Sequence, residues 1–222
     1  MMATLMTDID LRRNVEAELN WEPGIKSPST IGVRVQDGVV TLSGYVEAYT
    51  EKLAAERAVL RIAGVKALVN NIEVRLPTSS QRTDEDIARR AAEALDWTAG
   101  IPRDRIKVTV DDGWVTLKGT VDWYYQKAVA EDAVRYLNGV KGVFNLIEVR
   151  PAASKDVVKS KIEEALERNA ELEGERIEVE TIGSKVILRG TVRSWWQKEA
   201  AGRVAWQAPG VTQVENQIEV VV

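Results

Sequence analysis

Three short clusters of aromatic side chains are the residues whose type and spacing best support a binding chemistry. The clusters hold Tyr45 and Tyr49, then Trp123, Tyr124 and Tyr125, and then Trp195 and Trp196. Trp and Tyr favour bilayer interfaces and form the anchors of protein interfaces, so we interpret these rings as a candidate binding surface. Two alternatives stay open: the rings pack between neighbouring parts of the chain, or they belong to a local core.

Residue types that usually carry catalysis are scarce in the chain. Its 222 residues include no His and no Cys. The commonest general base, thiolate nucleophiles and the commonest ligands of transition metals are therefore missing. No pair among the 34 acidic residues stands out as an acid–base couple. We expect no catalytic residue, no cofactor, no metal ligand and no enzyme activity.

Composition and charge narrow the class of protein further. A net charge of −4 argues against nucleic acid as a partner, because such binding depends on neutralising phosphates. No apolar stretch approaches the roughly 18–20 residues that span a bilayer. The opening residues MMATLMTDIDLRRN lack the basic and apolar regions of a signal peptide. We therefore expect a cytoplasmic protein, with peripheral contact with a membrane left open.

One unit occurs three times in the chain. The copies run from Val35 to Val74, from Val110 to Val149 and from Thr181 to Val220. Three sets of residues recur in register: Gly44, Gly119 and Gly190; Gly64, Gly139 and Gly210; Asn70, Asn145 and Asn216. A repeat of this kind overrides any estimate of domain number from length alone. We predict three domains, 1–77, 78–151 and 152–222, joined by short linkers that contain Pro.

Each domain is predicted to begin with an amphipathic helix. The buried stripes are Leu11, Val15 and Leu19; Ile87, Ala91 and Leu95; and Val158, Ile162 and Leu166. Thr83 and Ser154, the latter ahead of Asp156, are the predicted N-caps of the second and third of these helices. Trp21 and Trp97 follow the first two helices, and we expect both to cover the core.

Two strands, a second helix and a last strand follow in each domain. The first two strands alternate in polarity and are joined by the predicted two-residue turns Asp37-Gly38, Asp112-Gly113 and Gly183-Ser184. The glycines after the second helix suit its C-terminus, and the three Asn are expected to order the turn into the last strand. The fold class is α+β: α-β-β-α-β units, each a three-stranded mixed sheet with two helices on one face.

The recurring Gly-Thr-Val, Gly-Val and Asn-x-Ile-x-Val segments resemble the BON domain (bacterial OsmY and nodulation domain). Gly119-Thr120-Val121, Gly190-Thr191-Val192 and the variant Gly44-Tyr45-Val46 carry the first segment. The resemblance covers about residues 8–76, 83–151 and 154–221. It implies a non-catalytic binding module of a family that includes osmotic-shock-induced proteins, for which phospholipid membranes are the commonest proposed ligand.

The sequence therefore predicts a stress-associated binding or scaffold protein that contacts membrane phospholipid or an envelope-associated protein. Repeated weak sites gain avidity when linkers allow simultaneous engagement. Two alternatives stay open. One is a sensor of a small ligand or of a cation such as potassium, which the resemblance includes and which backbone carbonyls would bind. The other is a purely structural repeat protein that forms homo-oligomers.

Overall fold

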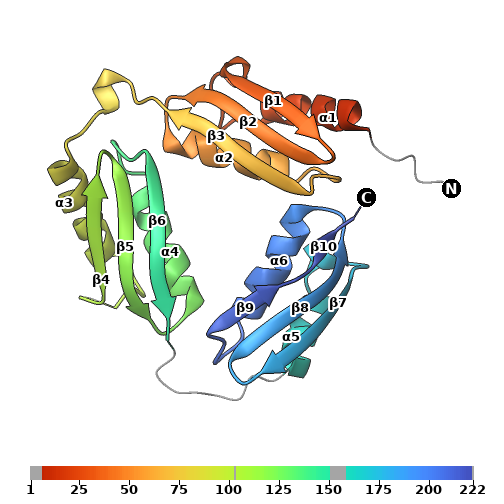
Figure 1. The fold of residues 1–222 in the computed structure, drawn as a ribbon. Helices are drawn as coiled ribbons and strands as arrows, with labels where there is room; N and C mark the ends of the chain where they lie inside the picture. Colours follow the sequence, from red (N-terminus) through yellow and green to blue (C-terminus); the bar gives the residue numbers. More distant parts are fainter. Residues whose placement is uncertain (1–6, 103, 151–158, 222) are drawn as a thin grey trace. The chain divides into compact units, whose positions relative to one another are not determined.

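The chain folds into three repeats of one element order. The computed structural model describes residues 7–102, 104–150 and 159–221. We call residues 7–75 repeat 1, residues 83–150 repeat 2 and residues 159–221 repeat 3. Each repeat runs helix, strand, strand, helix, strand, and both of its helices lie on the same face of its sheet (Figure 1). The predicted α-β-β-α-β unit and α+β class are confirmed.

The helices and strands have closely matched lengths across the repeats. Repeat 1 contains α1 (Asp8–Trp21), β1 (Ile31–Gln36), β2 (Val39–Val46), α2 (Tyr49–Leu60) and β3 (Ala67–Val74). Repeat 2 contains α3 (Asp84–Trp97), β4 (Ile106–Asp111), β5 (Trp114–Val121), α4 (Tyr124–Arg135) and β6 (Gly142–Val149). Repeat 3 contains α5 (Lys159–Glu167), β7 (Arg176–Ile182), β8 (Lys185–Val192), α6 (Trp195–Trp206), β9 (Gln213–Asn216) and β10 (Glu219–Val220). Single 3-10 turns occur at Pro28–Thr30, Thr78–Ser80 and Ala170–Leu172.

The second strand is central in every sheet. The orders are β1-β2-β3 and β4-β5-β6, and in repeat 3 β8 pairs with β7 on one side and with β9 and β10 on the other. The first two strands of each repeat pair antiparallel. In repeats 2 and 3 the last strand pairs parallel with the second, as predicted. The last strand of repeat 3 is interrupted at Gln217, whose N–H still donates to Leu188 O at 2.8 Å.

The core of each repeat lies between the sheet and its two helices. In repeat 2 the α3 stripe of Ile87, Ala91 and Leu95 packs on Val115 and Leu117 of β5. Burial of each large apolar side chain contributes roughly 1.5–3 kcal/mol to folding. The stripe predicted at Leu11, Val15 and Leu19 is likewise buried in α1.

Local signals place the helix starts and the hairpin turns. The Thr83 hydroxyl accepts from Asp86 N at 3.2 Å, as expected of an N-cap. Ser154, Asp156 and Val158 lie outside the described residues. The predicted turns all connect their strands directly: in the Asp112-Gly113 turn both φ angles are positive, 44° and 78°. In the third turn only Gly183 is left-handed, with φ 57°, which matches a type II′ rather than a type I′ turn.

The prediction that Trp21 and Trp97 cover the core is wrong. Each is the last residue of its helix, and the side chains are 83% and 88% exposed. Each lies two residues beyond a buried leucine, Leu19 or Leu95. Two residues correspond to about 200° of rotation around a helix, so both indoles point away from the buried stripe.

Candidate functional site

The predicted aromatic clusters occupy one structural position, the junction between the second strand and the second helix. Tyr49, Tyr124 and Trp195 are the first residues of α2, α4 and α6, and all three are half-buried. Tyr125 and Trp196 are the second residues of their helices. Trp123 is the N-cap residue of α4, and Tyr45 is an exposed residue of β2.

The rings of repeat 2 are more open than those of repeat 3. Trp123 and Tyr125 are 41% and 54% exposed. Trp195 and Trp196 are half-buried, and cations of their own helix lie over both rings. The Lys198 ammonium lies 5.0 Å from the centre of the Trp195 ring. The Arg203 guanidinium lies 4.8 Å from that of Trp196.

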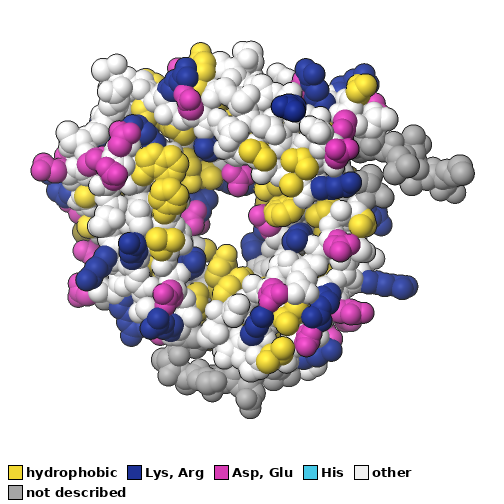
Figure 2. All heavy atoms as spheres, viewed as in Figure 1, with side chains coloured by type: hydrophobic (Ala, Val, Ile, Leu, Met, Phe, Trp, Pro, Cys, Tyr) yellow, Lys and Arg dark blue, Asp and Glu magenta, His cyan; other side chains and the backbone are white. Residues whose placement is uncertain are grey.

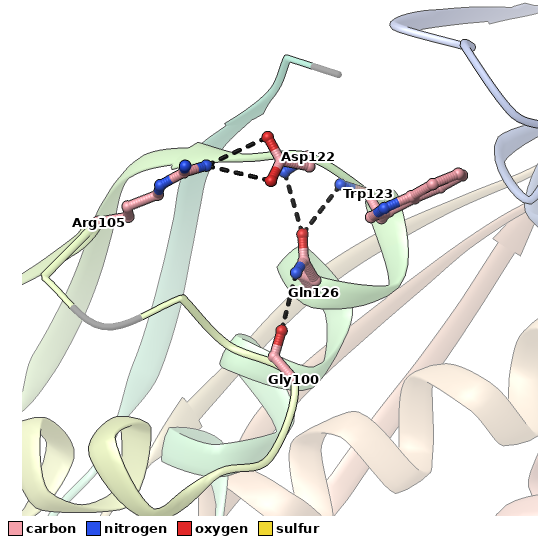
Figure 3. Close-up of polar contacts among 5 residues, drawn as sticks. All are labelled: Gly100, Arg105, Asp122, Trp123 and Gln126. Atoms are coloured by element: carbon pink, nitrogen blue, oxygen red, sulfur yellow. Dashed lines mark hydrogen bonds and ion pairs between the residues drawn. The ribbon is translucent and has the colours of Figure 1, made fainter. Parts of the chain in front are cut away.

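A buried amide holds the loop that carries Trp123 (Figure 3). Gln126 Oε1 accepts from the backbone N–H groups of Asp122 and Trp123, both at 3.0 Å. Its Nε2 donates to Gly100 O at 2.8 Å, which ties α4 to the loop after α3. Arg105 Nη1 donates to both carboxylate oxygens of Asp122, at 3.1 and 3.2 Å. This network fixes the backbone under the Trp123 ring and pairs the charges beside it.

The same position carries Gln in repeats 2 and 3 and Glu in repeat 1. Gln197 in repeat 3 accepts from Arg193 N at 2.9 Å and donates to Glu171 O at 3.2 Å. Glu51 in repeat 1 is buried and accepts from Lys26 N at 3.1 Å, while its Oε1 has no hydrogen-bond partner among the described residues. The carboxylate of repeat 1 therefore makes fewer hydrogen bonds than the amides of its counterparts.

A third exposed ring lies at the same end of repeat 2. Trp97 ends α3 three residues before Gly100, the residue that accepts from Gln126. Gly100 also lies against Tyr125, whose ring is the nearest group to an added Cβ. We call Trp97, Trp123 and Tyr125 the aromatic end of repeat 2. Sequence reasoning found two of these rings and placed the third, Trp97, in the core.

The glycines of the first motif lie where the backbone leaves no room for a side chain. Gly44, Gly119 and Gly190 have φ of 104°, 153° and 135°. A Cβ at these positions would collide with the backbone carbonyl of Thr30, Arg105 and Arg176, respectively. The second motif set, Gly64, Gly139 and Gly210, also has positive φ and lies in the loop beyond the second helix.

The recurring Asn, which were expected to order the turn into the last strand, lie within that strand and bond to the second helix and to the strand itself. Asn145 Nδ2 donates to Lys127 O of α4 at 2.8 Å, and its Oδ1 accepts from Ile147 N at 3.3 Å. Asn216 makes the equivalent bonds to Lys198 O and Ile218 N. These side chains brace the last strand against the second helix.

An exposed apolar group on the sheet of repeat 2 was missed by sequence reasoning. Trp114, Phe144 and Leu146 project from β5 and β6 on the face opposite the helices. The available signal was the alternation in β6, where Phe144 and Leu146 interleave with the core-facing residues Val143, Asn145 and Ile147. A half-buried strand with polar residues outward would not carry large apolar side chains at both positions.

Among the described residues, no group of three or more acidic side chains is arranged to hold a metal ion. No helix in the described ranges is long and apolar enough to cross a membrane.

The repeated unit and its motifs identify the family. The BON domain model matches residues 7–75, 83–151 and 154–222, so the chain belongs to the BON domain family. It is similar to osmotically-inducible protein Y of Escherichia coli (strain K12), with 29% identity over 158 residues, 67% of this chain and 76% of that protein.

Two solved structures also align along most of the chain. The C-terminal domain of CdsD, a structural protein of the type III secretion system of Chlamydia trachomatis, is 16% identical with a TM-score of 0.26, and the alignment covers 97% of this chain and 100% of that one. The periplasmic domain of PrgH is 10% identical with a TM-score of 0.21, and the alignment covers 86% and 95%.

Proposed function

We propose that this chain is a non-catalytic, osmotic-stress-associated protein that contacts a phospholipid surface through the aromatic end of repeat 2. The association with osmotic stress rests on the similarity to osmotically-inducible protein Y. The phospholipid contact rests on the three exposed rings, Trp97, Trp123 and Tyr125.

The observation that carries the proposal is that these exposed rings sit on a fixed backbone. Gln126 joins the loops on both sides of the aromatic end, at Gly100 and at Trp123. A pre-ordered loop loses little conformational entropy on binding. Trp and Tyr prefer the interfacial region of a bilayer, where the ring is apolar and its polar atom stays wet.

The size of the surface indicates weak, reversible binding. A fully buried aromatic side chain removes roughly 150–250 Å² from water, worth about 4–6 kcal/mol at 25 cal/mol per Å². The rings of the aromatic end are already partly covered, and association itself costs several kcal/mol. One aromatic end therefore gives a marginal attachment, which a second contact elsewhere in the chain would strengthen by avidity.

The charges beside the Trp123 loop are paired, and the exposed residue next to Trp97 is the acidic Asp96 rather than a cation. Arg105 is paired with Asp122, and Gln126 is neutral. The chain as a whole carries −4. Attachment by ring insertion, unlike adsorption of a basic segment on anionic lipid, depends little on ionic strength.

Sedimentation of the full chain with phosphatidylcholine vesicles, at low and high salt, tests this function. Wild type is expected to sediment equally at both salt concentrations. Trp97→Ser combined with Trp123→Ser is expected to reduce binding at least tenfold, with little effect on stability because both rings are exposed.

Trp21→Ser is the matched control. Trp21 ends α1 as Trp97 ends α3, but repeat 1 has Ala48 and Thr50 where repeat 2 has Trp123 and Tyr125. The control is expected to bind like wild type. Absence of wild-type binding, or an equal loss in Trp21→Ser, would contradict the proposed function.

A further inference from the structure

The outer face of the repeat 2 sheet carries a stacked pair of rings. The Trp114 and Phe144 rings are 5.0 Å apart between centroids and only 19° from parallel. Trp114 lies opposite Gly142 in the β5–β6 register, and a Cβ on Gly142 would collide with the indole. The absence of a side chain at Gly142 therefore lets Trp114 lie flat across β6 and reach Phe144.

This stack continues into an exposed apolar strip. Phe144 is 51% exposed and Leu146, the next outward residue of β6, is 55% exposed. Figure 2 shows hydrophobic side chains gathered over the position that β6 occupies in Figure 1, with Lys or Arg side chains beside them. The ring stack explains why Trp114 lies on this face, but it does not explain why the apolar Leu146 is exposed there.

Two lysines with no ion-pair partner lie next to the strip. Lys118 lies directly opposite Lys107 of β4 on one side and opposite Leu146 of β6 on the other. Both ammonium groups are exposed, and neither has an acidic partner among the residues that the structure describes. Like charges directly opposite each other on a sheet are destabilising, so folding alone gives no reason for this pair.

The other charges on the face do not neutralise the lysines. Glu148, the next outward residue of β6 after Leu146, is ion-paired with Arg150. Asp111 lies opposite Trp114, at the end of β4 away from Lys107. A cationic row therefore crosses the middle of the face, beside Phe144 and Leu146.

Neither of the other repeats has this combination. At the matching positions repeat 1 has Gly32 opposite Ser43. Repeat 3 has Glu178 opposite Arg189, and its outer face is neutralised by the ion pairs Arg189–Glu180 and Lys185–Glu215.

We propose that the outer face of the repeat 2 sheet docks an acidic, amphipathic segment of a partner protein. A carboxylate of the segment bridges Lys107 and Lys118, and an apolar side chain beside it covers Phe144 and Leu146. Charge complementarity carries this assignment, because an acidic group removes the lysine repulsion while the apolar strip loses its exposure. The inference does not depend on lipid binding at the aromatic end.

The geometry favours a protein segment over a bilayer. A bilayer separates anionic groups from apolar chains by depth, whereas Lys118 and Leu146 are cross-strand neighbours about 5 Å apart in one plane. In an extended peptide, side chains two residues apart lie on one face about 7 Å from each other, so an acidic and an apolar side chain can contact this face side by side. A two-fold contact with a second copy would bring four lysines together, which disfavours self-association through this face.

The test uses the full chain labelled for amide NMR and a short synthetic peptide in which Glu and Leu or Phe alternate at every second residue, with Ser between them, so that both types lie on one face. The peptide is expected to shift the amide signals of Lys118, Phe144 and Leu146 and to leave α3 and α4 unmoved. Replacing every Glu of the peptide by Gln is expected to weaken binding at least tenfold.

Two variants locate the contact. Lys107→Glu with Lys118→Glu is expected to weaken binding of the acidic peptide at least tenfold, as is Phe144→Thr with Leu146→Thr. Lys66→Glu with Lys161→Glu makes the same change of net charge at exposed positions of repeats 1 and 3, and is expected to bind like wild type. Vesicle sedimentation of all these variants is expected to equal that of wild type.

Four results would overturn the proposal. The first two are that wild type does not bind the peptide, or that the Lys107→Glu, Lys118→Glu variant binds it as well as the Lys66→Glu, Lys161→Glu control does. The third is that only Lys107→Glu with Lys118→Glu loses sedimentation with phosphatidylglycerol vesicles, and the fourth is that wild type self-associates and Phe144→Thr with Leu146→Thr abolishes this association. The last two would assign the face to lipid or to a second copy. None of the four bears on the aromatic end, whose failure is detected separately with phosphatidylcholine.

Discussion

Repeats 2 and 3 are built on one frame and differ in what they leave exposed. In repeat 2 the rings at the helix start are open and the sheet presents Phe144 and Leu146. In repeat 3 the rings lie under Lys198 and Arg203, and the sheet presents paired charges. The fold therefore constrains the residues that face the core, whereas the residues that face solvent differ between the repeats. Repeat 2 is accordingly the repeat to which we assign binding.

The largest predicted effect is on stability and tests whether repeats 2 and 3 share the same tight backbone contact at the motif glycine. Gly119→Val and Gly190→Val each place a Cβ against a backbone carbonyl at positive φ. Each is expected to destabilise its own repeat by about 3–4 kcal/mol. Hydrogen exchange at Leu117 and Leu188, buried residues of the central strands β5 and β8, measures the two losses separately. A large loss in one repeat and none in the other would show that the frames differ.

The next effect concerns the buried amide below the rings. Gln126 makes three hydrogen bonds and is buried, whereas Gln197 is only half-buried. Gln126→Ala is expected to cost about 2–3 kcal/mol and Gln197→Ala about 1 kcal/mol. Thermal melts report the stability, and the fluorescence of the aromatic end reports the loop. Equal costs would indicate that the Trp123 loop is held no more firmly than its counterpart.

A smaller change in the opposite direction sharpens the contrast between the sheets. Lys107→Glu gives repeat 2 the arrangement of repeat 3, with an acid opposite Lys118 as Glu178 lies opposite Arg189. It is expected to stabilise repeat 2 by about 0.5–1 kcal/mol, because a repulsive pair becomes attractive. Denaturant titration at low and high salt measures the gain, which salt should reduce. A loss of stability would mean that Lys107 makes a favourable contact of its own.

The smallest effect extends the comparison to repeat 1. A hydrogen bond from Arg61 to Glu22, which joins the segment after α2 to the end of α1, lowers the pKa of Glu22 below its ordinary value of 4.5. A carboxyl whose pKa is lower in the folded state stabilises the fold above its unfolded pKa, and this contribution is lost as pH falls through the folded value. Repeat 2 has Tyr136 at the place of Arg61.

Repeat 1 is therefore expected to lose a few tenths of a kcal/mol more than repeat 2 as pH falls below about 4.5, a size typical of exposed ion pairs. Arg61→Gln should remove this difference and leave stability at low pH unchanged. Hydrogen exchange at pH 6 and pH 4 would reveal it, and an equal pH dependence of wild type and variant would contradict the assignment.

The fold was predictable because its signals are local. The Asp-Gly turns, the helix stripe of Ile87, Ala91 and Leu95 and the Thr83 cap each specify their own few residues. Trp97 was misplaced because α3 continues through it, and one more half-turn rotates the indole away from the core. The end of a helix is the hardest feature to place from sequence alone.

The surface was predictable only in part, since it combines segments that lie apart in the chain. Trp123 and Tyr125 stood out as neighbours in the sequence, but the stack of Trp114 on Phe144 depends on the register between β5 and β6. The position of the Lys198 ammonium over the Trp195 ring could have been predicted from the sequence, because Lys198 follows Trp195 by three residues on one helix.

The Asn in each last strand also affects whether the open edge of its sheet can pair with another strand. Arg150 donates its N–H to Val121 of β5, so residues of the other parity in β6, Ile147 among them, direct theirs away from the sheet. Asn145 already accepts that outward N–H. In repeat 1 both backbone groups of Ile72 are hydrogen-bonded to side chains, because Asn70 accepts from its N–H and Lys52 donates to its carbonyl oxygen at 2.8 Å.

An apolar strand such as Gly142–Val149 would otherwise offer a free template for another strand. Three units of one fold on one chain hold such strands at high mutual concentration, the condition under which strand exchange and fibre growth begin. The Asn side chains therefore occupy an edge N–H that another strand would otherwise need for pairing. With these side chains in place, the chain can carry three BON domains without adding free strand edges at which chains could pair.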